Sequence, residues 1–160
     1  MKKIKNPWLH LTKEGYHCFG CAPTNPWGLK LEVYEDGDDI VAFWNAHDNY
    51  QGWIKTLHGG IQATLLDEIA GWVVFRKLQT AGQTVRLNMK YKHPIPTGED
   101  VQLIIRSRLT EMKRNMAVIT AEIIHENRVC SSAEMTYYCF TKEQSEQIFH
   151  LSSCEVDEQQ

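Results

Sequence analysis

The stretch HGGIQATLLDEIAGWVVF, residues 58–75, decides the fold because it is the one long helical pattern in the chain. At 100° per residue its apolar side chains cover most of the helix circumference, with Ile61, Leu65 and Ile69 on one side and Ala70 opposite. A helix that is apolar almost all round is a buried helix. We therefore predict a buried central helix at this point of the chain.

The rest of the chain reads mainly as strands. We expect the helix to run from Ile61 to about Leu78, preceded by two strands and followed by four. The predicted strands are Leu29–Tyr34, Ile40–Asn45, Thr84–Tyr91, Val101–Thr110, Met116–His125 and Val129–Phe140, with a short surface helix at Lys142–Phe149. Six antiparallel strands can bury one helix only if the sheet curls around it. The fold class is therefore α+β, a curved sheet of about six strands wrapped around one long helix.

The strand Thr84–Tyr91 alternates cleanly between apolar and polar residues. Strict alternation predicts two faces, because successive side chains of a strand point in opposite directions. One face is expected to hold Val85, Leu87, Met89 and Tyr91, and the other to hold Thr84, Arg86, Asn88 and Lys90.

Composition excludes several classes of protein. A chain of 160 residues is expected to form one domain, with residues 1–28 as an N-terminal loop segment and residues 141–160 as a C-terminal extension that frays after Cys154. The net charge of −3 offers no cationic field, so nucleic acid is not an expected partner. The longest apolar run, Ile69–Phe75, is too short to cross a membrane. Five scattered cysteines fit reduced thiols and a cytoplasmic protein.

Two features of the helix carry chemistry. The carboxylates of Asp67 and Glu68 lie inside an apolar element, and a buried carboxylate needs a polar partner or a cleft. Gly59 and Gly60 precede the first turn, where unpaired backbone N–H groups and the positive end of the helix dipole form an oxyanion site. His58 could act as a base, but before two glycines a structural hydrogen bond is the more frequent role. Together these groups suit acyl chemistry.

The segment from His58 to Asp67 resembles the His-Gly-Gly-x(6)-Asp signature of hotdog-fold acyl-CoA thioesterases of the phenylacetate-pathway type. The resemblance extends to residues 84–88, to residues 94–99 and, upstream, to the Cys18–Cys21 and Asn25–Leu29 segments. It implies a hotdog fold and hydrolysis of an acyl-CoA thioester without a metal or other cofactor.

The same resemblance implies roles for individual residues. The amide of Gly59 would polarise the thioester carbonyl, Asp67 would act as general base or nucleophile, and Thr84 would orient the water. Gly59 and Asp67 of one site would come from different subunits, so a homodimer or homotetramer is expected. Many members carry an asparagine six residues before the histidine, where this chain has Gly52; Asn49 or Gln51 is a candidate substitute.

Some motifs admit two interpretations. Cys18-x-x-Cys21 has the spacing of half a zinc site, with His10 and His17 nearby, but a structural turn without metal is the favoured interpretation. Arg86 and Lys90 are either a solvated strand face or a binding site for coenzyme A phosphates.

The function also has alternatives. The first is a non-catalytic protein that binds or senses acyl-CoA, against which the presence of Asp67 argues. The second is a hydratase or dehydratase on the same scaffold, whose arrangement of His and acid around a Pro-Gly step is absent from this sequence.

Overall fold

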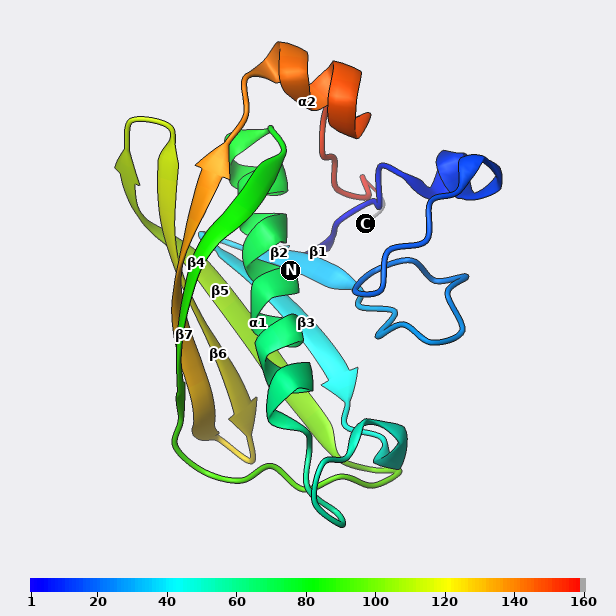
Figure 1. Ribbon diagram of the computed structural model, residues 1–160, viewed down its shortest axis with the longest axis vertical. Helices are drawn as coiled ribbons and strands as arrows, with labels where there is room; N and C mark the ends of the chain where they lie inside the picture. The colour runs from blue at the N-terminus through cyan, green and yellow to red at the C-terminus, as the bar shows by residue number, and fades with distance from the viewer. Residues whose placement is uncertain (159–160) are drawn as a thin grey trace.

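A computed structural model describes residues 1–158 and shows one antiparallel sheet curved around a central helix (Figure 1). The sheet has seven strands in the order β1-β2-β3-β5-β6-β7-β4. The strands are β1 (Lys2–Lys3), β2 (Val33–Asp36), β3 (Asp39–Asn45), β4 (Gly82–Tyr91), β5 (Gln102–Lys113), β6 (Met116–His125) and β7 (Arg128–Cys139). The helices are α1 (Gly59–Val73), which continues as a π-turn over Val74–Leu78, and α2 (Lys142–Phe149), with short 3-10 turns at Leu9–Glu14 and Asp48–Tyr50.

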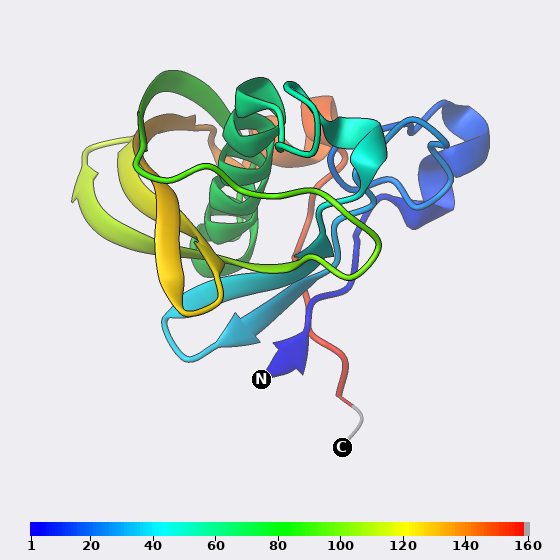
Figure 2. The ribbon, with the colours of Figure 1, turned by 90° about the horizontal axis from the view of Figure 1, so that it is seen from below.

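Helix α1 is buried as its all-round apolar sequence predicts. Figure 2, which views the molecule from below, shows the sheet curving around it. Leu65, Leu66 and Ile69 have no exposed surface, and Trp72 is only 1% exposed. Full burial of such a side chain contributes about 1.5–3 kcal/mol, so this helix is a major source of stability. The fold class predicted from the sequence is confirmed.

Local interactions set the two ends of the helical segment. At the start, the Nδ1 atom of His58 accepts a hydrogen bond from the Gly60 N–H at 2.9 Å, which is an N-cap contact. At the far end, Gln79 adopts a left-handed conformation with φ 54°, which ends the helical backbone. The predicted end near Leu78 therefore agrees with the structure.

The six predicted strands are present with shifted ends: the first begins at Val33 rather than Leu29, and β5 ends at Lys113 rather than Thr110, while the short strand β1 was not predicted. Leu29 and Leu31 are buried but bond elsewhere, since the N–H of Leu29 donates to Phe19 O at 2.7 Å and that of Leu31 donates to Gly20 O at 2.9 Å. They hold the N-terminal segment against the molecule instead of extending the β2–β3 pair.

A β-bulge in β4 overturns the predicted grouping of its side chains. The pairing with β7 shifts register between Thr84 and Arg86, and a bulge adds one unpaired residue to the strand. Thr84 therefore faces α1 together with Leu87, Met89 and Tyr91, not with Arg86, Asn88 and Lys90 as strict alternation predicts. This shift brings the Thr84 hydroxyl to the helix.

The N-terminal segment packs against α1. It lies on the side of α1 that the sheet leaves uncovered (Figures 1 and 2). Trp8 packs edge-on against Trp72 and Phe75, with ring centroids 6.0 and 5.1 Å away, and its Nε1 donates to Phe149 O at 2.7 Å. Residues 1–28 thus close the core.

The C-terminal segment is also docked. Val156 pairs with Ile4, and the Asp157 N–H donates to Lys3 O at 2.8 Å. The prediction that the chain frays after Cys154 is wrong for the residues up to Asp157, because Val156 and Asp157 bond to the N-terminal segment. Residues 159–160 lie outside the described part of the chain. Among the described residues, no helix combines the length and hydropathy needed to span a membrane.

The burial of α1 gives a stability prediction. Ile69→Ala should lower the free energy of unfolding by about 2–5 kcal/mol, because it removes a fully buried side chain and leaves a cavity. Urea denaturation of the wild type and the variant measures the difference. The matched control is Ile148→Ala, since Ile148 is 58% exposed on α2. Similar losses in both variants would contradict the assigned role of α1.

Candidate active site

The carboxylate of Asp67 is held by two hydroxyl groups from neighbouring strands. Its Oδ1 atom accepts a hydrogen bond from Thr84 Oγ1 at 2.6 Å and from the Tyr137 hydroxyl at 2.5 Å. Hydrogen bonds to an ionised acceptor are short and strong, so two such donors fix the carboxylate in one orientation. Sequence reasoning placed Asp67 and Thr84 in one site, and the structure brings them into contact.

Tyr137 is the residue of this cluster that sequence reasoning missed. It is 2% exposed, and its hydroxyl also lies 2.6 Å from the backbone O of Asp67. Burial, and then the charge of Asp67, raise the pKa of the Tyr137 phenol, which keeps it a neutral donor. The signal was present in the sequence: Ala133, Met135 and Tyr137 alternate on one face of a predicted strand. That face is the one that packs against α1.

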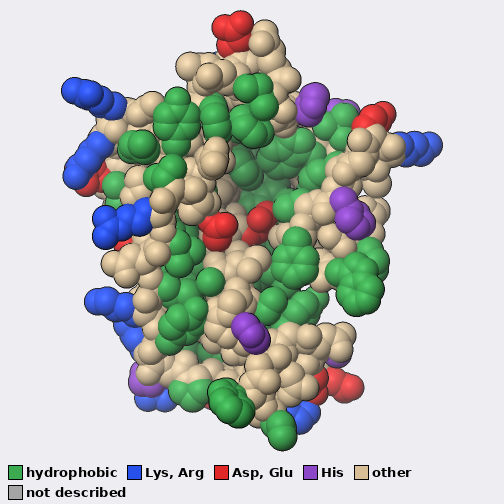
Figure 3. Space-filling view, viewed as in Figure 1, with side chains coloured by type: hydrophobic (Ala, Val, Ile, Leu, Met, Phe, Trp, Pro, Cys, Tyr) green, Lys and Arg blue, Asp and Glu red, His purple; other side chains and the backbone are tan. Residues whose placement is uncertain are grey.

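The second carboxylate oxygen of Asp67 is open for chemistry. Within residues 1–158, Oδ2 has no hydrogen-bond partner, and the residue is only partly buried. The space-filling view shows acidic atoms within a hollow bordered by hydrophobic side chains (Figure 3). An oriented carboxylate with one free oxygen can accept a proton from water or attack an electrophilic carbon.

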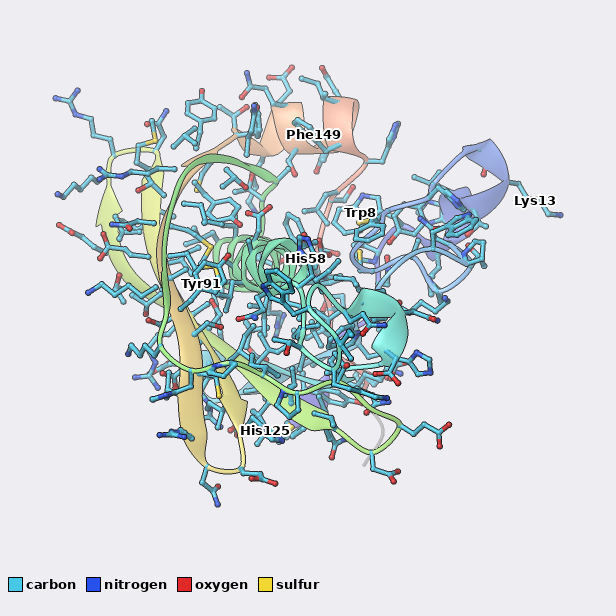
Figure 4. All side chains as sticks on the ribbon, turned by 60° about the horizontal axis from the view of Figure 1, so that its bottom comes forward. Trp8, Lys13, His58, Tyr91, His125 and Phe149 are labelled. Carbon is cyan, nitrogen blue, oxygen red and sulfur yellow. The ribbon has the colours of Figure 1, made fainter. Side chains whose placement is uncertain are left out.

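The first turn of α1 presents a free backbone donor at Gly59. The Gly60 N–H is used by the Nδ1 atom of His58, whereas the Gly59 N–H has no acceptor within the described residues. The Tyr91 hydroxyl donates to Gly59 O at 2.8 Å, and a Cβ at Gly59 would lie 3.3 Å from the Tyr91 ring (Figure 4). Of the two glycines predicted at the site, Gly59 therefore has the available N–H, and His58 caps the helix.

The loop before α1 holds Asn49 and Gln51, the two candidate substitutes for the missing asparagine. The Asn49 N–H donates to His47 Nδ1 at 3.2 Å, and Gln51 Oε1 accepts from the Lys55 N–H at 3.1 Å, so the Gln51 amide folds back into its own turn. A Cβ at Gly52 would lie 3.3 Å from the Cα and Cδ2 atoms of His58. This close approach leaves little room for a side chain at that position.

Arg86 and Lys90 lie away from Asp67. Beyond the bulge they point to the face of the sheet opposite α1, where Lys90 borders a shallow concavity together with Arg106 and Arg108. The structure therefore separates the two predicted phosphate ligands from the carboxylate by the thickness of the sheet.

Glu68 has surroundings quite unlike those of Asp67. Its Oε1 accepts a hydrogen bond from Trp72 Nε1 at 3.1 Å, and its Oε2 lies 4.0 Å from Cys18 Sγ. Burial, followed by the charge of Cys18, raises the pKa of the Glu68 carboxyl to about 7. The Cys18–Cys21 segment covers the Glu68 side chain.

Comparison with known proteins finds thioesterases. Residues 54–132 match the family model described as "Thioesterase superfamily". Acyl-coenzyme A thioesterase 13 of Homo sapiens is 25% identical over 88 residues, which are 54% of this chain and 61% of that protein. The chain thus matches less than two thirds of the length of this curated relative.

Solved structures share the fold. A crystal structure of a thioesterase superfamily protein has a TM-score of 0.70 and 24% identity, covering 84% of this chain and 68% of the other. A hypothetical thioesterase from Streptococcus pneumoniae, solved with coenzyme A, has a TM-score of 0.61 and 22% identity, covering 68% of this chain and 87% of the other. The curved sheet, its central helix and these structural neighbours show that this chain has the hotdog fold, and residues 54–132 are similar to the thioesterase superfamily.

Proposed function

We propose that this protein hydrolyses an acyl-CoA thioester to a carboxylic acid and coenzyme A. The observation that carries the proposal is the Asp67 carboxylate, which has one oxygen held by Thr84 and Tyr137 and the other free. The proposal extends to the phenylacetate-pathway type of this family, on the spacing between His58 and Asp67. The S. pneumoniae neighbour solved with coenzyme A supports the choice of substrate class.

In the proposed reaction the free oxygen of Asp67 takes a proton from water as the water oxygen attacks the thioester carbon. The Gly59 N–H donates to the carbonyl oxygen, whose negative charge grows as the carbon becomes tetrahedral; one such donor is worth about 2.7–4 kcal/mol. The carbon–sulfur bond then breaks, and the leaving coenzyme A sulfur takes the proton that Asp67 received from the water, which regenerates the carboxylate. Thr84, which donates its proton to Asp67, keeps oxygen lone pairs that can accept a hydrogen bond from the water.

A nucleophilic route uses the same groups. Asp67 Oδ2 would attack the thioester carbon, coenzyme A would leave, and water would then cleave the resulting acyl anhydride to regenerate the carboxylate. Both routes need only water as co-reactant, so no metal or redox cofactor is proposed for the hydrolysis. A cytoplasmic location is part of the proposal, supported by the five cysteines, all of which are free thiols.

We also propose that each active site is shared between two subunits. Gly59 and Asp67 are eight residues apart on α1, which corresponds to about 12 Å of helix. This separation is too long for both to act on one thioester group. A second chain placed antiparallel to the first would bring its own Gly59 near this Asp67.

The edge strand β4 is the proposed contact between subunits. It terminates the sheet, and the apolar side chains of Val85, Leu87 and Tyr91 are 53%, 38% and 56% exposed. An unpaired strand edge with exposed apolar side chains is a surface suited to pairing with a second copy. A homodimer or a homotetramer built from it is the proposed assembly.

Asp67→Asn tests the proposed chemistry. Because the amide keeps the size of the side chain but cannot accept a proton or attack, kcat should fall by on the order of 10²- to 10⁴-fold. Thiol release from a panel of acyl-CoAs measures the rate, and binding of the substrate should change much less. The matched control is Asp100→Asn, on an exposed loop. Turnover near the wild-type rate in Asp67→Asn would refute the site, and tight binding without any wild-type hydrolysis would identify a binding protein.

Tyr137→Phe tests the support of Asp67. Loss of one hydrogen bond to a charged group is worth about 1.5–3 kcal/mol, so kcat should fall roughly 10- to 100-fold while KM changes little. Steady-state kinetics separates the two constants. Tyr138→Phe is the control, since the neighbouring hydroxyl does not contact Asp67 within the described residues. An equal loss in both variants would contradict the proposed role.

Complementation tests the shared site. Gly59→Pro removes the free N–H, and proline is accepted at the first position of a helix. Gly59→Pro and Asp67→Asn should each be nearly inactive alone. Co-expressed as mixed dimers, they should restore activity at about one quarter of the sites, because each mixed dimer rebuilds one intact site of two. An inactive mixture that nevertheless contains mixed dimers would place both groups in one chain.

A further inference from the structure

A second cluster of reactive groups lies next to the candidate active site and takes no part in the proposed hydrolysis. The thiols of Cys18 and Cys21 and a carboxylate oxygen of Glu68 all lie within 4.8 Å of one another. The two cysteines come from the N-terminal segment, whereas Glu68 comes from α1. We call these three residues the Cys2Glu cluster.

The backbone around the Cys2Glu cluster is arranged to admit the carboxylate. A Cβ at Gly20 would lie 2.2 Å from Glu68 Oε2, so a side chain there would displace the carboxylate. Further contacts position the loop: buried Asn25 donates from Nδ2 to His17 O at 3.2 Å, and its Oδ1 accepts from the Trp27 N–H at 3.0 Å. The loop thus brings both thiols next to the carboxylate of Glu68.

Two aromatic side chains orient members of the cluster. Trp72 Nε1 donates to one oxygen of Glu68 and leaves the other directed at Cys18. The Tyr16 hydroxyl accepts from Asn6 Nδ2 at 2.8 Å and lies 3.1 Å from Cys21 Sγ, so its own proton is available to that sulfur. Donors that hold a carboxylate and a thiolate from behind are typical of metal ligands.

The charges of the cluster lack a balancing cation. None of the ion pairs in the described part of the chain involves Glu68. Two thiols and a carboxylate therefore lie close together without a cationic side chain paired to the carboxylate, and a bound cation would supply that charge.

We propose that Cys18, Cys21 and Glu68 bind a divalent metal ion of the zinc class. Two thiolates and one carboxylate are a donor set that zinc prefers, with Zn–S distances of about 2.3 Å and Zn–O distances of about 2.0–2.2 Å. Bringing atoms now up to 4.8 Å apart to these distances needs only side-chain adjustment. Cys21 also borders a cavity lined by Lys5, Leu31 and other residues, which gives an ion and a fourth ligand access.

The carboxylate is the reason to prefer a metal over a disulfide. A Cys18–Cys21 disulfide would leave Glu68 beside an uncharged group, with one oxygen unpartnered in a partly buried position. His10 and His17, the ligands that the sequence suggests beside this motif, are exposed and outside the cluster. Glu68, 47 positions beyond Cys21, is the third ligand that local sequence spacing does not reveal.

Metal analysis of the untagged protein tests the proposal. The protein is first reduced, then incubated with Zn²⁺, and finally desalted. We expect about one zinc per chain, and Co²⁺ in its place should give thiolate-to-cobalt charge-transfer absorption. Cys18→Ser and Glu68→Gln should each weaken Zn²⁺ binding by more than about tenfold in chelator competition. Cys139→Ser is the matched control, because Cys139 lies on β7 outside the cluster.

The outcomes separate this proposal from the proposed hydrolysis, because zinc content and cobalt spectra do not depend on turnover. Circular dichroism of each variant verifies folding, and Glu68→Gln, which keeps the side-chain size, serves if a cysteine variant does not fold. The proposal would be overturned if the incubated protein held no stoichiometric zinc. It would also be overturned if Glu68→Gln and Cys18→Ser bound zinc as tightly as Cys139→Ser does. A Cys18–Cys21 disulfide that survives reduction and excludes zinc would do the same.

Discussion

The structure depends on the burial of α1 within the curved sheet. An apolar helix surrounded by strands is stable, but α1 also carries two adjacent carboxylates, and a carboxylate without polar partners is costly in such a place. Asp67 and Glu68 point about 100° apart, so one set of neighbours cannot serve both. The fold supplies a separate set of polar groups for each.

These two sets come from opposite sides of the helix. The sheet provides hydroxyl groups from β4 and β7, which bind a single oxygen of Asp67 and leave the other available. The N-terminal segment provides the cover over Glu68, with an indole N–H and two thiols. Asp67 is thus oriented towards an opening, and Glu68 is enclosed by an indole N–H and two thiols. The difference arises from the surroundings, since the two side chains differ by only one methylene group.

Much of this arrangement can be predicted from the sequence. Periodicity alone identifies the buried helix and most strands, because apolar patterning reports directly on which face is covered. The spacing from His58 to Asp67 identifies the helix start and one acid, both of which are local features. Tyr137 was missed because its contact with Asp67 depends on the packing of β7 against α1, between residues 70 positions apart. The surroundings of Glu68 were missed for the same reason, since its neighbours lie in a loop without periodicity.

The bulge between Thr84 and Arg86 has a consequence for how the protein can change. It offsets the alternation of β4, so Thr84 before it and Leu87, Met89 and Tyr91 after it all face α1. A single-residue insertion or deletion at this point would rotate one part relative to the other and exchange its two faces. Such a change would turn either Thr84 away from Asp67 or the apolar side chains of the second part away from the helix.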